Sequence, residues 1–371
     1  MPVLAPDGSG GRAFLPDPLP RDVTLSTATW TAVNEATAAL ARLDGAARQL
    51  PDASLLRHPA VRREAQSTSA LEGTYAPLPE VLAADADDRA HLGSELFEVL
   101  NFEDVAELAF SWPEERRLTL AMLGELQRTL VQGTSGALPD AGGLRDRLVM
   151  IGARGARLDS ARFVPPPPGD QLRSGVEALL DWFNDPPSLP TVVQAAMTHY
   201  QFESLHPYSD GNGRIGRLLV IVQLMRGAVI REPLLVVSPW FEARRPQYQD
   251  ALLELSRSGD WSSWIGFFAE GIAASATESG QKVEALVALQ QELRLRVREG
   301  GKRGATERLA SDLIGLPYVD TTQVAERCNL SRQGAANTVR ALVDLGILEA
   351  VGAVGRATLY RAPDVTRILE D

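Results

Sequence analysis

Residues 206–217 read H-P-Y-S-D-G-N-G-R-I-G-R, and this segment constrains the fold more than any other part of the chain. The apolar run from Leu218 to Met225 follows it directly. Gly211 and Gly213 therefore predict a tight loop that leads into a buried helix. The first turn of a helix leaves backbone N–H groups free, and such groups bind phosphate. The segment thus predicts an anion-binding loop at the N-terminus of a core helix.

Charged side chains flank this loop on both sides. Arg214 and Arg217 lie on the first turn of the predicted helix, so both guanidinium groups can reach the same side and bind phosphate oxygens. His206, with an ordinary pKa of roughly 6.5, is the candidate general base. Asp210 would repel a polyphosphate unless Mg²⁺ bridges them. Asn212 suits the loop because it tolerates left-handed backbone angles. Together these residues predict phosphoryl or nucleotidyl transfer.

The segment resembles the signature of the Fic family, H-P-F-x-[DE]-G-N-G-R-x-x-R, with Tyr208 in place of Phe. Tyr keeps the ring that anchors the loop and adds a hydroxyl that needs a partner. The resemblance implies transfer of AMP from ATP to a Ser, Thr or Tyr hydroxyl of a target protein, with self-modification expected. It implies a mainly α fold with a Fic-type helical core. Its residue roles are His206 as the base, Asp210 as the Mg²⁺ ligand, Gly211, Asn212 and Gly213 as the anion loop, Arg214 at the β-phosphate and Arg217 at the γ-phosphate.

The position of Gly213 bears on which group is transferred. A phosphotransferring branch of the family has Lys there, so the glycine favours AMP transfer. The same letters also spell G-x-G-x-x-G, and Glu232 lies about where a dinucleotide-binding fold places its ribose-binding acid. That fold needs a β-strand before the first glycine. The residues upstream, such as Val193 and Tyr200, follow helical spacing instead, so we reject the dinucleotide reading.

A second segment, S-T-S-A-L-E-G-T at residues 67–74, matches the Fic inhibitory pattern [ST]-x-x-x-E-[GN] at Thr68, Glu72 and Gly73. Pro59 and Gly73 predict a helix over about 59–72. An acid in the last turn opposes the helix dipole at a cost of roughly 0.3–1 kcal/mol, so Glu72 needs a partner. The resemblance supplies Arg217, whose pairing with Glu72 blocks the γ-phosphate position.

Two short β-like runs, Leu148–Ile151 and Arg162–Val164, predict a hairpin. The resemblance implies that this hairpin is the flap that binds a target peptide by strand addition. Its candidate target-binding residues are Leu148, Val149, Met150, Ile151 and Gly152. Two further residues allow more than one interpretation. Tyr248 is expected in the core, although it could wall the adenine, and His199 is expected to be structural because no metal-ligand spacing surrounds it.

The composition limits partners and compartment. A net charge of −11 argues against nonspecific binding to nucleic acid or to acidic membranes. Cys328 is the only cysteine, so an internal disulfide is impossible and a reducing compartment is expected. The N-terminus lacks the pattern of a signal peptide, and no apolar run approaches the ~18 residues of a membrane helix. We therefore expect a cytoplasmic protein without membrane contact.

The chain is expected to divide into four parts. Residues 1–112 are predicted to form an extended arm of about 20 residues and a helical region with the inhibitory helix. Residues 113–280 are the predicted catalytic core, and 281–304 a linker helix. Residues 305–371 predict a winged helix-turn-helix unit.

The face of this unit formed by residues 331–340 could contact DNA through Arg332, Gln333, Asn337 and Arg340. The unit's balanced charge weakens that prediction, and packing or homodimerisation suits it equally. Two other functions use the residues named so far. One is removal of AMP with Glu72 positioning water, and the other is a DNA-binding regulator whose Fic core senses nucleotide. The sequence does not decide between transfer and removal.

Overall fold

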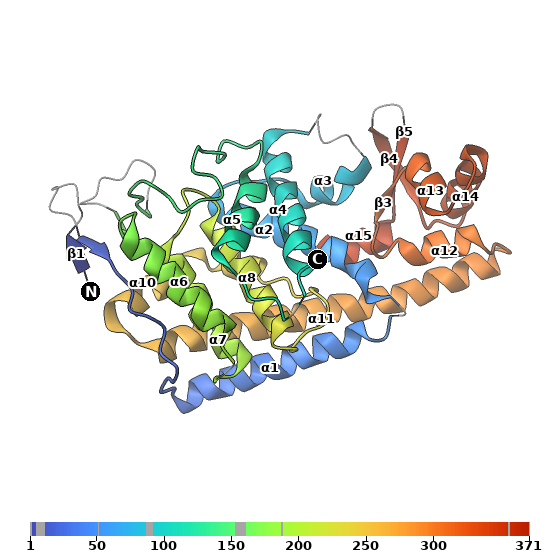
Figure 1. Cartoon of the computed structure of the whole chain (residues 1–371). Coiled ribbons are helices and arrows are strands. Elements are labelled where there is room, and N and C mark those ends of the chain that lie inside the picture. Colours follow the sequence, from blue (N-terminus) through green and yellow to red (C-terminus); the bar gives the residue numbers. More distant parts are fainter. Residues whose placement is uncertain are drawn as a thin grey trace.

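The computed structural model describes Pro2 to Glu370 except residues 5–11, 51, 87–91, 114, 153–160, 187 and 355–356. The described part is mainly helical, as predicted (Figure 1). Its α-helices are α1 (Thr27–Ala47), α2 (Arg57–Glu72), α3 (Leu78–Ala83), α4 (Ser94–Phe110), α5 (Leu120–Val131), α6 (Asp170–Asn184), α7 (Thr191–Leu205), α8 (Asn212–Arg226), α9 (Ser238–Ala243), α10 (Arg245–Ser258), α11 (Trp261–Glu299), α12 (Ala305–Asp312), α13 (Thr321–Arg327), α14 (Arg332–Asp344) and α15 (Pro363–Glu370). Short 3-10 helices are η1 (Ala53–Leu56) and η2 (Ala84–Ala86), and the strands are β1 (Pro2–Leu4), β2 (Arg12–Phe14), β3 (Tyr318–Val319), β4 (Glu349–Val354) and β5 (Ala357–Arg361).

Two long helices, α1 and α11, lie side by side along the bottom of the view in Figure 1. They run in the same direction, because the Thr29 hydroxyl donates to the Ser262 carbonyl near their N-termini and Leu43 lies next to Gly280 further along. The Asp260 carboxylate caps α11 by accepting a hydrogen bond from the Ser262 N–H. This helix pair forms the base on which the shorter helices pack.

The structure corrects the predicted linker helix over 281–304. Helix α11 runs without a break through the predicted boundary, because its buried stripe continues from Ala276 to Val283. Gly280 does not end the helix, since packing outweighs its propensity cost of roughly 1 kcal/mol. Neither α11, with its 39 residues, nor any other helix of the described residues is apolar enough to cross a membrane.

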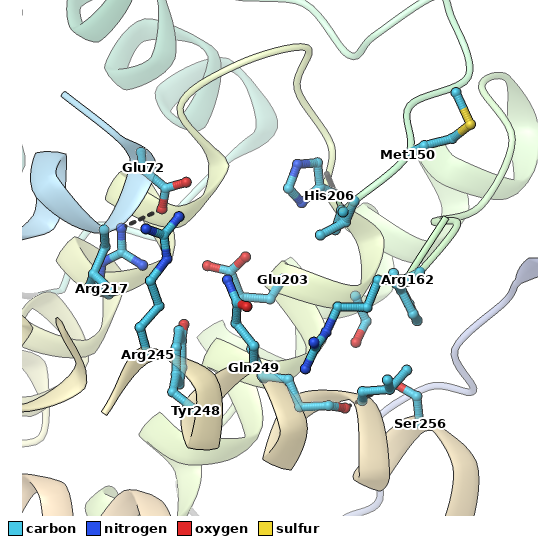
Figure 2. Close-up of a pocket in the computed structure, with 18 residues that line it drawn as sticks. Glu72, Met150, Arg162, Glu203, His206, Arg217, Arg245, Tyr248, Gln249 and Ser256 are labelled. Atoms are coloured by element: carbon cyan, nitrogen blue, oxygen red, sulfur yellow. Dashed lines mark hydrogen bonds and ion pairs between the residues drawn. The ribbon is translucent and has the colours of Figure 1, made fainter. Parts of the chain in front are cut away.

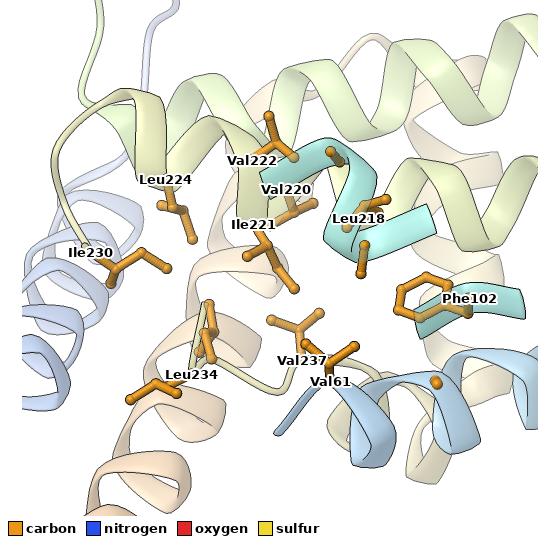
Figure 3. Close-up of a cluster of buried hydrophobic side chains, with 14 of the residues drawn as sticks. Val61, Phe102, Leu218, Val220, Ile221, Val222, Leu224, Ile230, Leu234 and Val237 are labelled. Carbon is orange, nitrogen blue, oxygen red and sulfur yellow. The ribbon is translucent and has the colours of Figure 1, made fainter. Parts of the chain in front are cut away.

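Helix α8 lies at the centre of the core, and most of its residues are buried. Its side chains Leu218, Ile221 and Leu224 share a buried cluster with Val61 of α2 and Phe102 of α4 (Figure 3). A helix that is apolar on all sides needs neighbours on all sides. The surrounding helices therefore fix the position of the loop that precedes α8.

Helix α2 is an integral part of this core. It begins two residues before the predicted start at 59 and ends at Glu72, followed by Gly73 in the left-handed conformation with φ of 99°. The buried Glu64 carboxylate accepts hydrogen bonds from the N–H groups of Val237 and Ser238 at 2.8 and 3.0 Å. Because these N–H groups lie at the start of α9, Glu64 caps that helix and fixes α2 to it.

The arm at residues 1–20 is not simply extended. Strands β1 and β2 pair in antiparallel fashion. The Phe14 N–H donates to the Val164 carbonyl at 2.8 Å, and the Phe14 ring lies 5.5 Å from that of Phe163. The arm therefore packs against the second run of the predicted flap.

The C-terminal residues form three helices, α12 to α14, and a three-stranded sheet in the order β3-β5-β4. Helix α15 follows and was not predicted. The residues proposed from sequence to face DNA, Arg332, Gln333, Asn337 and Arg340, are exposed on α14.

Candidate active site

The segment 206–217 forms the turn between α7 and α8, which pack against each other. His206 ends α7 with φ of 47° and Gly211 precedes α8 with φ of 86°. These two residues, and not Asn212, take the left-handed conformation that the sequence had assigned to Asn212. Asn212 is helical, and its amide instead holds the turn: its oxygen accepts from the Tyr208 N–H at 2.9 Å and its nitrogen donates to the Tyr208 carbonyl at 2.7 Å.

The left-handed backbone of His206 costs roughly 1–3 kcal/mol in a residue other than glycine. The hydrogen bonds around the turn offset this cost. The first backbone bond of α8 joins the Ile215 N–H to the Gly211 carbonyl at 3.0 Å. The N–H groups of Asn212, Gly213 and Arg214 therefore have no partner within the helix, which suits them to bind an anion.

A cavity of about 690 Å³ opens beside this turn (Figure 2). Its walls come from α2, α7, α8, α10 and the two runs of the predicted flap. The sequence-predicted site residues that line it are Glu72, Met150, Ile151, Gly152, His206, Gly213 and Arg217. Residues Arg162, Glu203, Arg245 and Gln249 line it as well, and the sequence did not single them out as site residues.

Arg214 and Asp210 lie to one side of this cavity. The Arg214 guanidinium is buried and donates to Glu98 at 2.7 Å and to Asp210 at 3.2 Å. Of the two arginines expected to point to the same side, only Arg217 lines the cavity. Glu98 was missed because no local pattern joins residues 116 positions apart.

Arg217 is held by the last turns of α2. Its Nη2 donates to Glu72 Oε1 at 2.6 Å, and its Nε donates to the Thr68 hydroxyl at 2.7 Å. Nη2 also donates to the Thr68 carbonyl at 3.1 Å. The segment predicted to be inhibitory and the second arginine of the loop are thus in direct contact (Figure 2).

Glu72 occupies space that only a glycine at position 213 leaves open. A Cβ atom on Gly213 would lie 1.9 Å from Glu72 Oε1. Burial acts to raise the pKa of Glu72, but the charge and hydrogen bond of Arg217, together with the charges of Arg214 and His206, outweigh burial and the pKa is lowered. Burial likewise acts to lower the pKa of Arg217, but Glu72, Tyr248 and Glu203 together outweigh burial, so that pKa is raised. Both groups are therefore charged at neutral pH.

His206 faces the cavity on the side opposite Arg217 (Figure 2). Burial lowers the pKa of its imidazole to about 4. The charge of Glu72 opposes this shift, and the charge of Arg145 adds to it. The imidazole is consequently unprotonated at neutral pH, which is the form that accepts a proton.

Glu203 is a second carboxyl group in the cavity (Figure 2). Burial raises its pKa to about 7, and its Oε1 is buried without a hydrogen-bond partner among the described residues. One signal for it was present in the sequence: it lies three residues before His206 on the same predicted helix, where both side chains share a face.

The Glu203→Gln variant should change how stability depends on pH. The folded protein binds more protons than the unfolded chain between the ordinary Glu203 pKa of 4.5 and the raised value of about 7, so stability falls as pH rises through this window. The variant does not lose stability in this way. Its melting temperature minus that of the wild type should therefore grow from pH 5 to pH 8. A difference in melting temperature that is the same at both pH values contradicts the assignment.

Three further side chains with rings, those of Tyr248, His199 and Tyr208, are buried. Tyr248 is both buried and part of the cavity wall. His199 is buried, and its Nε2 shares a hydrogen bond of 2.7 Å with the Tyr248 hydroxyl. Burial lowers the pKa of His199 to about 3, so it is neutral. Tyr208 keeps its ring in the core, but its hydroxyl has no hydrogen-bond partner among the described residues, and burial raises its pKa.

The predicted flap is reduced to one antiparallel bridge in the described residues. Ile151 and Phe163 exchange both backbone hydrogen bonds, at 2.9 and 3.1 Å. Leu148 and Val149 form no strand, and Met150 is exposed. The predicted tip at 153–160 lies outside the described residues.

Family sequence models match two adjacent segments of the chain. The model described as Fic/DOC family N-terminal matches residues 30–111, and the model described as Fic/DOC family matches residues 117–224. The first match contains α2 with Glu72. The second contains α7, the loop and most of α8.

Curated relatives match over part of the chain. It is 36% identical over 109 residues to "Protein adenylyltransferase Fic" of Drosophila willistoni and 31% identical over 138 residues to "Protein adenylyltransferase fic-1" of Caenorhabditis elegans. These matches cover 29% and 37% of this chain but only 20% and 24% of the relatives. The chain therefore matches less than a quarter of each relative's length.

Solved structures share the fold over a longer stretch. A Fic family protein from Desulfovibrio desulfuricans superposes with a TM-score of 0.60 at 20% identity, covering 93% of this chain and 98% of that one. A Fic domain containing signaling protein from Bacteroides thetaiotaomicron gives 0.51 at 19% identity, covering 66% and 97%. At these identities the likeness shows a common fold.

Proposed function

The chain belongs to the Fic family, and we propose that it is a self-inhibited protein adenylyltransferase. In this function it transfers AMP from ATP to a Ser, Thr or Tyr hydroxyl of a target protein, its own chain included. The observation that carries the proposal is the convergence of His206, Gly213 and Arg217 on one cavity. A proton acceptor, an anion-binding helix terminus and a cation meet where a nucleotide can bind.

In the proposed reaction the neutral imidazole of His206 accepts the proton of the target hydroxyl. The hydroxyl oxygen forms a bond to the α-phosphorus of ATP, the bond from that phosphorus to the bridging oxygen breaks, and pyrophosphate leaves. The free N–H groups at the start of α8 stabilise the phosphate charge. Arg217 binds the γ-phosphate once Glu72 has released it.

Asp210 is proposed to hold Mg²⁺ together with the phosphates. Its side chain is 41% exposed beside the N-terminus of α8. Mg²⁺ is commonly bound by one or two carboxylates, substrate phosphates and water, so a single carboxylate fits it. Among the described residues no group of three or more His, Cys, Asp or Glu side chains could hold a metal alone. The bound ion would neutralise charge on the phosphates.

The Asp210→Ala variant should lose the magnesium dependence of ATP binding. The test is calorimetric titration with ATP, with and without Mg²⁺, in a Glu72→Gly parent whose Arg217 is free. Asp210→Asn is the matched control, because it keeps an oxygen that Arg214 can donate to and loses only the charge. Both variants should bind ATP equally with and without Mg²⁺. An undiminished magnesium effect in both would show that Asp210 is not the ligand.

The proposed inhibition follows from the contacts of Arg217. Three of its hydrogen bonds go to Thr68 and Glu72, so its guanidinium is occupied by α2. A γ-phosphate must displace the Glu72 carboxylate to reach it, and charged hydrogen bonds are costly to lose. These contacts support the proposal that the state with Glu72 on Arg217 is the inhibited one.

Labelled ATP tests the proposed reaction directly. The Glu72→Gly variant should incorporate label into protein from ATP labelled at the α-phosphate and none from ATP labelled at the γ-phosphate. Incorporation of γ-label instead would assign phosphoryl transfer. If neither the variant nor added cell protein takes up label from either form of ATP, adenylyl transfer is refuted.

One observation also favours AMP removal by the same site. The Glu72 side chain is 39% exposed and lines the cavity that contains His206, so its carboxylate can orient a water molecule there. Protein that has been AMP-labelled by the Glu72→Gly variant provides the substrate. Wild-type enzyme should release that label as AMP if it catalyses removal, and a Glu72→Gln variant should not.

A further inference from the structure

The strongest unassigned feature beside the cavity is the guanidinium of Arg145. Its residue is 2% exposed, and burial lowers its pKa to about 10, so it remains charged at neutral pH. All its hydrogen bonds in the described residues go to backbone carbonyl oxygens. Nε donates to His206 at 2.8 Å, Nη1 to Arg147 at 2.9 Å, and Nη2 to Pro166 and to Leu205.

These four carbonyls belong to three segments of the chain, and this one side chain contacts all three. Leu205 and His206 end α7, where carbonyls lack helical partners and attract positive charge. Arg147 precedes the first run of the flap, and Pro166 follows the second. In addition, the Arg145 N–H donates to the Pro207 carbonyl at 3.0 Å.

The segments that Arg145 joins by hydrogen bonds form two walls of the same cavity. Ile151 and Phe163 from the flap line it, and so does His206. His206 keeps a left-handed backbone that needs outside support. A planar guanidinium holds five donors in a fixed geometry, whereas an ammonium group has three donors on a flexible stem.

We propose that Arg145 is a positioning residue that fixes the flap and the general base relative to each other. This proposal rests on the adenylyl transfer proposed above. A hydroxyl presented by the flap must reach the imidazole at hydrogen-bond distance, and one side chain sets both positions. The ATP phosphates are proposed to bind at the start of α8, and none of the hydrogen bonds of Arg145 named above reaches that helix. Its loss should therefore affect the transfer rate and spare ATP affinity.

Hydrogen–deuterium exchange and self-labelling of an Arg145→Lys variant in the Glu72→Gly parent test the proposal. Exchange should rise together in residues 147–152, 163–166 and 206–211 and stay unchanged in 218–224 of α8. The maximal labelling rate should fall about 10²-fold, the effect of a 1 Å misplacement, while ATP affinity is retained. Arg147→Lys is the matched control: its side chain is half exposed and only its backbone belongs to the network, so exchange and rate should match the parent.

Two outcomes would overturn the proposal. Faster exchange throughout the chain, with rate loss equal to the unfolded fraction, would mean that Arg145 only stabilises the fold. Faster exchange in the flap or in 206–211, but not in both, would mean that the two are held independently. If the parent itself transfers no AMP, the proposed function fails, and the exchange pattern still decides whether Arg145 links the two segments.

Discussion

Replacing His206 by alanine is expected to reduce AMP transfer by about 10²–10⁴-fold, the usual contribution of a general base. Its imidazole is neutral at pH 7 because burial lowers its pKa to about 4, and it lines the same cavity as Arg217. The fold should survive, since the main contacts of position 206 are made by its backbone: the N–H donates to Phe202 at 2.9 Å and the carbonyl accepts from Arg145.

The measurement is incorporation of α-labelled AMP by a Glu72→Gly parent with and without His206→Ala, alongside thermal unfolding of both. His206→Asn is the matched control, because Asn adopts left-handed backbone angles more readily than Ala and cannot act as a base. Both variants should be inactive and folded. An active Asn variant beside an inactive Ala variant would show that position 206 supplies backbone geometry and no base.

Replacing Glu72 by glycine is expected to raise AMP transfer by about 10- to 100-fold, the factor that corresponds to ~1.5–3 kcal/mol for a hydrogen bond between charged groups. The change removes the carboxylate that holds Arg217 at 2.6 Å. It should leave α2 in place, because Gly73 already ends the helix and Glu64 fixes its middle to α9.

One control variant separates the charge of Glu72 from its bulk. Glu72→Gln keeps the size and loses the charge, so it should activate as well, although a residual neutral hydrogen bond to Arg217 makes the effect smaller. Acidification is not an equivalent release. Because the pKa of Glu72 is lowered, the carboxylate stays ionised until the pH falls below the ordinary range of glutamate, and the inhibition should not vary between pH 6 and pH 8.

The sequence predicted the parts of the site that a short pattern contains. The turn before α8 was predictable because its glycines and the apolar run after them admit few other structures. The contact between Glu72 and Arg217 was predictable only through resemblance, since 145 positions separate the two residues. The expectation that Asn212 takes the left-handed conformation was wrong. Its side-chain amide instead forms two hydrogen bonds with the backbone of Tyr208.

Other features depend on tertiary packing that no local pattern records. Arg214 pairs with Glu98, and Arg145 gathers carbonyls from three segments, including Pro166. Helix α11 continues past 280 because it packs against α12 and α15 as well as against α1, whereas the charged composition of 281–298 had suggested a separate solvated helix. In each case the partner lies far away in sequence, so only the fold brings the groups together.

The most direct test of the account is AMP labelling by three proteins side by side: wild type, Glu72→Gly, and Glu72→Gly with Arg217→Ala. Each is incubated with α-labelled ATP over a range of ATP and Mg²⁺ concentrations, and label on protein is counted. We predict low labelling by the wild type, a rise of about 10- to 100-fold in the single variant, and loss of that rise in the double variant, which lacks the guanidinium for the γ-phosphate. Labelling by Glu72→Gly that never exceeds the wild type would contradict built-in inhibition by α2.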